Sequence, residues 1–261
     1  MKDLSILVPA RQEMFLKNTV DDILKNIEAD TEIIIHLDGA WSDPPIPQHE
    51  RVNIVYSPEA IGQRAGTNLA CKLSKAKYVM KLDAHAAFDK GFDRKMLEAF
   101  KETGDNVTMV PIMRNLWAFD WKCYKCGSRW YQGPPPKRCM KHEGRQIVPN
   151  EACDELTNFK RKITWLTEAK KGQSAFYNWR RERGPNSSSF CFDTEPHFQY
   201  FNEYTKRPEF LKDREEKGLT ETMSIQGSCF MTTRENYWKW ELCGEDIGSW
   251  GNQGIEVACN T

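Results

Sequence analysis

The chain has 261 residues, of which 39% are apolar and 11% aromatic, so it can bury a sizeable core and is not a disordered protein. Its 37 Lys and Arg residues balance 37 Asp and Glu residues, which excludes a highly charged tail or fibre. No apolar run approaches the roughly 20 residues of a membrane span. The N-terminal segment lacks the apolar stretch and cleavage site of a signal peptide, so we expect no membrane span and a cytoplasmic location.

The first 112 residues alternate between short apolar runs and segments with helical periodicity. Strands are expected at 4–10, 32–38, 52–56, 78–83 and 107–112, and helices at 16–28, 62–75 and 92–102. This alternation is typical of the α/β class, in which helices cover both faces of a mostly parallel sheet. In the helix at 62–75 we expect Leu69, Ala70 and Leu73 to face inward.

The composition changes near residue 114. Residues 114–183 contain 16 Lys and Arg but 7 Asp and Glu, a net charge of +9, and the remainder of the chain carries −9. From about residue 220 the sequence again has the pattern of regular secondary structure, with a strand expected at 224–235 and a helix after Gly254. We therefore predict one domain formed by residues 1–113 and 184–261, with a basic, aromatic insert at 114–183. The last helix reaches Thr261 without a cap or breaker, so we expect a further C-terminal part.

Cysteine usage predicts a zinc module inside this insert. The nine Cys residues are an odd number, and without a signal peptide this indicates a reducing compartment. Cys123, Cys126, Cys139 and His142 form two close pairs, a spacing that suits tetrahedral, structural Zn²⁺. Cys153 is an alternative fourth ligand. We place the module at about 120–145, and the competing interpretation is free thiols with a surface His.

Polar residues follow the expected strands at the edge where open parallel sheets bind ligands. Asp83 and His85 follow the strand at 78–83, and residues i and i+2 of extended backbone point the same way. A carboxylate with an imidazole suits Mn²⁺, whereas Mg²⁺ would depend on Asp83 and phosphate oxygens. The pattern predicts a divalent-metal site, and the alternative is a capping Asp beside a surface His.

Four segments occur in an order that resembles the GT-A fold of nucleotide-sugar glycosyltransferases, in particular family 2: SILVPARQE, HLDGAWSD, GQRAGTNLA and KLDAHAAF. The D-x-H form of the last segment is similar to that of the polypeptide N-acetylgalactosaminyltransferases. The resemblance implies a nucleoside pocket at one set of strand ends, a diphosphate near the following helix and a metal beside it. The implied donor-binding residues are Pro9, Ala10, Arg11, Glu13 and Asp38 for the nucleoside, Gly62 and Arg64 for the phosphates, and Asp83 and His85 for the metal.

Two later segments extend the resemblance to about 1–112 and 222–259. IQGSCFMTTRENYW resembles the strand before the acceptor site, and WGNQGIEVA resembles the W-G-G-E-N-x-E segment of those transferases. Gln253 stands at the position of the first Glu, which puts its sugar contact in doubt, and Glu256 matches the second. The third metal ligand of the family, a His after this segment, has no counterpart before Thr261.

Sugar transfer also requires stabilisation of the leaving group and removal of the acceptor proton. The departing diphosphate develops negative charge, which a divalent ion and Arg64 would stabilise. An inverting enzyme needs a carboxylate to deprotonate the acceptor hydroxyl, and Glu245, Asp246 and Glu256 are the candidates. We predict Asp246 and Glu256 as catalytic residues, because Asp246 lies in an acid-acid pair and Glu256 matches the family segment. For each, the alternative is an acid at a helix N-terminus, and inverting or retaining chemistry stays open.

Together these features predict a metal-dependent hexosyltransferase that uses a UDP-sugar, with UDP-glucose the preferred donor. Basic and aromatic residues of the insert suit a polyanion with stackable bases, so a hydroxymethylated base in DNA is one expected acceptor, beside protein or glycan. The alternative of another class is a zinc-stabilised nucleic-acid-binding module on an inactive scaffold. A nucleotidyltransferase is disfavoured because no glycine-rich phosphate loop follows the first strand.

Overall fold

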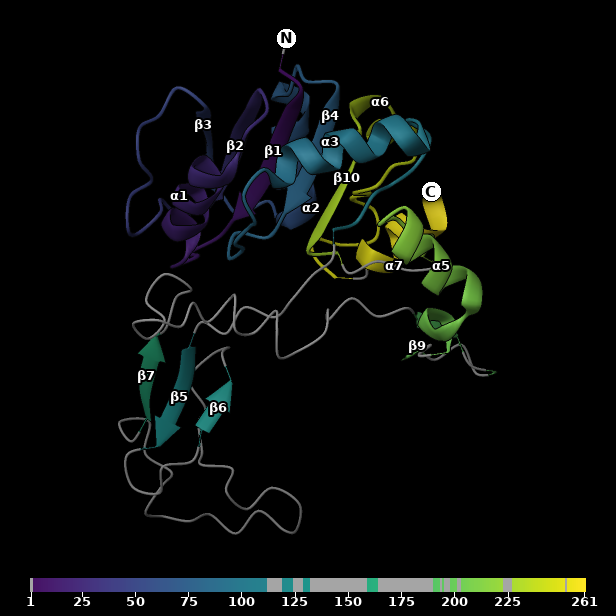
Figure 1. Ribbon diagram of the computed structural model, residues 1–261. Coiled ribbons are helices and arrows are strands. Elements are labelled where there is room, and N and C mark those ends of the chain that lie inside the picture. Colours follow the sequence, from purple (N-terminus) through teal and green to yellow (C-terminus); the bar gives the residue numbers. More distant parts are fainter. Residues whose placement is uncertain are drawn as a thin grey trace. The chain divides into compact units, whose positions relative to one another are not determined.

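The computed structural model describes residues 2–111, 203–222, 227–251 and 253–261, and, between these, residues 119–123, 129–131, 159–163, 190–192, 194 and 198–200. The chain forms two compact units (Figure 1). One contains residues 1–113 and 186–261, and the other contains residues 114–185. The two units are described separately below.

The first unit contains a five-stranded sheet with the order β10-β4-β1-β2-β3. Its strands are β1 (Leu4–Ala10), β2 (Thr31–Asp38), β3 (Val52–Ser57), β4 (Tyr78–Leu82) and β10 (Cys229–Thr233). β1 pairs in parallel with β2 and β4, β2 pairs in parallel with β3, and β10 alone runs antiparallel, beside β4. The expected α/β class with a mostly parallel sheet is confirmed.

Helices connect and cover these strands. They are α1 (Leu16–Asn26), α2 (Gln63–Leu73), α3 (Phe92–Thr103), the short 3-10 helix η3 (Tyr204–Lys206), α5 (Pro208–Glu216), α6 (Arg234–Lys239) and α7 (Gln253–Asn260). Figure 1 shows α3 and α2 on opposite faces of the sheet. Within the described residues, every helix is too short or too polar to cross a membrane.

Alternation along the strands builds a core on each face of the sheet. Leu4, Ile6 and Val8 of β1 point into one cluster, which also holds residues of α1 and α3. Leu7 points the other way, into a cluster with Ala70 of α2 and residues of α6 and α7. The central strands are therefore apolar at consecutive positions, as the sequence predicts for strands that are covered on both faces.

Three sequence expectations about the elements are wrong. The expected strand at 107–112 is reduced to one antiparallel bridge between Met109 and Met231. The strand expected at 224–235 ends at Thr233, because the hydroxyl of Thr233 accepts the Asn236 N–H and caps the start of α6. Leu73 is 51% exposed, since the inward face of α2 runs through Thr67, Ala70 and Cys71 at helical spacing.

The second unit contains an antiparallel sheet with the order β6-β5-β7. Its strands are β5 (Phe119–Cys123), β6 (Arg129–Tyr131) and β7 (Phe159–Ile163). A two-stranded sheet of β8 (Phe190–Phe192) and β9 (Phe198–Tyr200) belongs to the first unit. Cys123 ends β5, and the other predicted zinc ligands, Cys126, Cys139 and His142 with the alternative Cys153, lie outside the described residues.

Candidate active site

The carboxyl end of β1 leads into the predicted nucleoside pocket. Pro9 is half-buried, Ala10 is buried and Arg11 is exposed. Gln12 has a φ of 51°, which turns the chain sharply before Glu13. Pro9 and Ala10 thus end β1, and Arg11 and Glu13 lie on the turn that follows, at the carboxyl edge of the sheet where parallel strands bind ligands.

Asp38, the last residue of β2, is 4% exposed and connects the strand end to the start of α2. Its carboxylate accepts the Ile61 N–H at 2.6 Å and the Gly62 N–H at 3.1 Å. Gly62 has a φ of 90°, and a Cβ there would lie 2.5 Å from the Ser249 Cβ. The position therefore requires glycine, because the left-handed backbone and the close approach both exclude a side chain.

Glu13 orients His85, a contact that the sequence analysis did not foresee. The Nδ1 of His85 lies 3.0 Å from one Glu13 oxygen, and the other Glu13 oxygen accepts the Phe15 N–H at 2.9 Å. This hydrogen bond to Glu13 raises the pKa of the exposed His85. In the tautomer that donates from Nδ1, the Nε2 lone pair is available to a metal ion, an arrangement typical of ligating histidines.

Asp83 is anchored by a buried lysine. Lys81 is 1% exposed, and its Nζ lies 2.5 Å from Asp83 Oδ1 and 2.6 Å from the Gly227 carbonyl oxygen. Lys81 is not among the residues predicted from sequence, although a single Lys within an apolar strand, two residues before an Asp, is a usable signal. The Asp83 backbone N–H also donates to the Ser228 carbonyl, at 2.9 Å.

The geometry at Asp83 and His85 differs from the expected extended backbone. β4 ends at Leu82, and the chain bends at Ala84 and His85, so the spacing i, i+2 of a strand does not apply. The Glu13 hydrogen bond is the main cause of the raised pKa of His85, and the Asp83 charge acts in the same direction. The carboxylate and imidazole fit Mn²⁺ as a donor set. Within the described ranges, no group of three or more His, Cys, Asp or Glu side chains could hold a metal ion.

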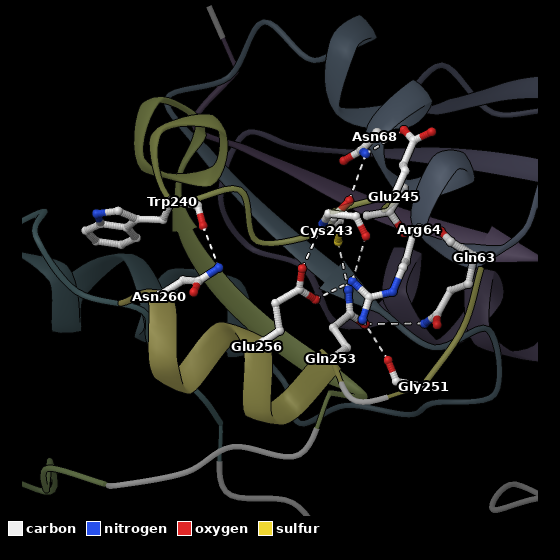
Figure 2. Close-up of polar contacts among 12 residues, drawn as sticks. Gln63, Arg64, Asn68, Trp240, Cys243, Glu245, Gly251, Gln253, Glu256 and Asn260 are labelled. Atoms are coloured by element: carbon white, nitrogen blue, oxygen red, sulfur yellow. Dashed lines mark hydrogen bonds and ion pairs between the residues drawn. The ribbon is translucent and has the colours of Figure 1, made fainter. Parts of the chain in front are cut away.

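Arg64, predicted near the diphosphate, lies in a buried network at the start of α2 (Figure 2). Its side chain is 1% exposed and forms an ion pair with Glu256 of α7, which is 8% exposed. Arg64 Nη1 also donates to the Gly244 carbonyl at 3.0 Å, and Nη2 donates to the Gly251 carbonyl at 2.7 Å. Glu256 Oε1 accepts the Gly244 N–H at 2.8 Å. The guanidinium and carboxylate thus contact the protein itself.

The other acids of this region differ in exposure. Asp246 and Glu245 are exposed, and Glu245 Oε1 accepts from Asn68 Nδ2 at 2.8 Å. Gln253, which stands at the first Glu position of the family segment, is 5% exposed, and its Nε2 lies 2.7 Å from Cys243 Sγ (Figure 2). Asp246 is therefore accessible to an acceptor, whereas Glu256 and Gln253 are engaged inside the protein.

Comparison with known proteins now identifies the family. Residues 5–152, more than half of the chain, match glycosyl transferase family 2. The chain belongs to glycosyl transferase family 2. This membership confirms the sequence interpretation as a glycosyltransferase. No curated protein matches the chain.

This family 2 glycosyltransferase is also similar to a solved structure, described as the crystal structure of GalNAc-T7 with UDP, GalNAc and Mn²⁺. The two chains are 13% identical, with a TM-score of 0.57. The match covers 99% of this chain and 39% of the GalNAc-T7 chain. At this identity the likeness concerns the fold, and it confirms the expected GT-A arrangement. The chain spans about two fifths of the length of that neighbour.

Proposed function

We propose that this protein transfers a hexose from a UDP-sugar to a hydroxyl acceptor in a reaction that depends on Mn²⁺ or Mg²⁺. The observation that carries the proposal is the position of Asp83 and of His85, which Glu13 orients, directly after β4 at the carboxyl edge of the sheet. Membership of glycosyl transferase family 2 supports the reaction class. The similar GalNAc-T7 structure was solved with UDP and Mn²⁺, which supports the choice of nucleotide and metal.

In this proposal Asp83 and His85 hold the divalent ion. The bound ion supplies positive charge to the leaving diphosphate. Glu13 keeps the proton of His85 on Nδ1, and Lys81 fixes the rotamer of Asp83 through its bond to Oδ1. Pro9, Ala10, Arg11 and Asp38 line the nucleoside pocket, and the start of α2 at Gly62 lies beside the phosphates.

We infer that Asp246 is the base that deprotonates the acceptor. Asp246 is exposed, as an acceptor-facing base must be. The Glu256 side chain is 8% exposed, and its oxygens already accept from Arg64 and from the Gly244 N–H, so it is not presented to an acceptor. The geometry therefore favours Asp246 over Glu256 for this role.

For the acceptor we propose a hydroxymethylated base in DNA. The net charge of +9 over residues 114–183 supports contact with phosphates, and the Trp and Tyr residues there supply stacking groups. A base inside a duplex would have to be flipped out to reach a transferase site. We also propose that zinc bound by Cys123, Cys126, Cys139 and His142 organises part of this segment. Protein or glycan acceptors are the competing outcomes of an acceptor screen.

The first test is a thermal-shift panel of UDP-, GDP- and CDP-sugars, with and without Mn²⁺, followed by a UDP-sugar hydrolysis assay. One UDP-sugar should raise Tm in a Mn²⁺-dependent manner, because a ligand that binds only the folded state stabilises it. Asp83→Asn should abolish the Mn²⁺-dependent part of the shift and the hydrolysis. The matched control is Asp3→Asn, an exposed Asp immediately before β1, at the opposite edge of the sheet.

The alternative of an inactive scaffold makes the opposite prediction. No donor would then stabilise the protein or be hydrolysed, while salt-sensitive binding to DNA would persist. Stabilisation by a donor that is equal in wild type and Asp83→Asn would instead contradict the metal site.

A further inference from the structure

The loop at 244–251 carries the exposed acids and two exposed apolar side chains. Asp246 and Glu245 lie on it, together with Ile247 at 51% and Trp250 at 79% exposure. No residue of this loop belongs to a helix or strand. No regular backbone ladder supports it, and its backbone bonds, Gly248 N–H to the Glu245 carbonyl and Arg64 N–H to the Ser249 carbonyl, are 3.4 and 3.3 Å long, so side-chain contacts add to its support.

The guanidinium of Arg64 contacts both ends of this loop. Arg64 Nη1 donates to the carbonyl of Gly244, the first residue, and Nη2 donates to the carbonyl of Gly251, the last. The backbone N–H of Arg64 also lies 3.3 Å from the Ser249 carbonyl oxygen. The planar fork of an arginine can bridge two carbonyls in this way, whereas a lysine ammonium acts as a point charge.

Glu256 completes the arrangement from α7. It forms the ion pair with Arg64 and accepts the Gly244 N–H through its other oxygen, so Gly244 is bound at both its N–H and its carbonyl (Figure 2 shows the Arg64–Glu256 contact). Arg64 and Glu256 are both nearly inaccessible to solvent. Neither side chain is presented to a donor or an acceptor.

We propose that Arg64 and Glu256 are positioning residues that hold the loop at 244–251 in the shape that places Asp246 for catalysis. This inference rests on the proposed function, in which Asp246 is the base. It differs from the sequence expectation, in which Arg64 contacts the diphosphate and Glu256 acts on the acceptor. In the positioning role, substitution of Arg64 changes the loop and the chemical step while donor binding persists.

The test compares Arg64→Lys with wild type in the full chain, by hydrogen exchange and by kinetics. Exchange in the peptide spanning 244–251 should rise in Arg64→Lys, because one ammonium cannot bridge both ends of the loop. The kcat for UDP-glucose hydrolysis should fall by about 100-fold, since small displacements of a catalytic group have effects of that size. The KM for UDP-glucose and the calorimetric Kd for UDP should stay within about twofold of wild type.

Arg51→Lys is the matched control. Arg51 is half-buried, and its Nη1 likewise bridges two carbonyls, those of Ala29 and Thr31, at 3.1 and 3.0 Å. These contacts lie beside the start of β2, away from the loop. Arg51→Lys should leave exchange at 244–251 and the kcat unchanged.

A second variant covers the case in which Arg64→Lys fails to fold. The double substitution Arg64→Met with Glu256→Leu removes both buried charges together, which is better tolerated than removal of one partner. It should fold with rapid exchange at 244–251 and retain UDP affinity.

A loss of UDP affinity in the Arg64 variants, with exchange at 244–251 unchanged, would overturn the inference and assign Arg64 to the phosphates. The exchange measurement needs no substrate. Failure of wild type to bind any UDP-sugar would therefore count against the proposed function, while unchanged exchange in the variants would count separately against the role of Arg64.

Discussion

At the residue scale, His36 illustrates how closely α2 approaches the sheet. His36 of β2 is fully buried, and its Nε2 lies 2.8 Å from the Ser57 hydroxyl. A Cβ on Gly66 of α2 would lie 2.3 Å from His36 Nδ1, so only glycine fits there. Burial lowers the pKa of His36, although the nearby Asp38 acts in the opposite direction. Its surroundings therefore favour the neutral form of the imidazole.

This environment makes the stability of the protein depend on pH. As pH falls through the ordinary His pKa of about 6.5, His36 becomes protonated in the unfolded chain at a higher pH than in the folded protein. Protonation therefore stabilises the unfolded state, and the free energy of unfolding should fall as pH falls. The slope is at most about 1.4 kcal/mol per pH unit for one proton. Urea denaturation from pH 7.5 to 5 should show a smaller decrease in His36→Asn. The control is His49→Asn, a substitution at an exposed position. Identical slopes of unfolding free energy against pH in wild type, His36→Asn and His49→Asn would contradict the prediction.

At the element scale, α1 holds the loop that carries His85. The Thr19 hydroxyl donates to the Ala84 carbonyl and accepts the Ala86 N–H, both at 3.0 Å, so it contacts the backbone on each side of His85. Asp22, one turn further along α1, accepts the Phe88 N–H at 2.6 Å. Thr19 is fully buried, and these bonds are shielded from water. The position of the proposed metal ligand thus depends on the helix that follows β1.

Thr19→Val tests this dependence with a side chain of nearly the same shape. The substitution leaves a buried carbonyl and a buried N–H without their partner, and we expect a loss of about 1–3 kcal/mol in the free energy of unfolding. Thr19→Ser retains the hydroxyl and should recover most of that loss. Chemical denaturation of Thr19→Val and Thr19→Ser measures this difference. Equal free energies of unfolding in the two variants would show that the hydroxyl does not contribute to stability.

At the scale of the whole molecule, the two compact units differ in net charge and in the sheet that each contains. Residues 114–183 carry +9, whereas the rest of the chain carries −9 and contains the five-stranded sheet. The sheet unit has its own core on each face, and the residues of both clusters come from that unit. We therefore expect the sheet unit to keep its structure when the basic unit is perturbed.

If the proposed zinc is bound, its chelation should affect the two units differently. A chelator should increase hydrogen exchange around residues 115–150, because a metal-organised module loses its folding energy with the ion. The Tm shift produced by UDP should persist after Mn²⁺ is restored. Cys123→Ser should mimic chelation, and the exposed Cys259→Ser should not. Joint loss of UDP binding and of structure throughout the chain would show that the zinc module is not separate.

The local pattern of apolar residues was sufficient to predict most helices and strands of the unit that contains the five-stranded sheet. β1 begins and ends at the predicted residues, and the other predicted strands of the parallel sheet and their helices agree to within a few positions, because apolar periodicity over 5 to 12 residues decides which face is buried. The motifs at the strand ends lie at the carboxyl edge of the sheet, as their positions after the expected strands predict. The exception at 107–112 is instructive, since an apolar run becomes a strand only where a partner strand has free backbone groups, and β10 offers it a single bridge, at Met231.

The contacts that define the site followed from tertiary structure alone. Glu13 and His85 are 72 residues apart in sequence, and Arg64 and Glu256 are 192 apart. The resemblance to the transferase family assigned Arg64 to a phosphate and Glu256 to an acceptor, whereas the fold brings these two charges together and buries both. A charge is stable in such a place only beside its opposite. Which partner it meets is set by the order of the strands and the packing of α2 against α7, and no local pattern of residues encodes that choice.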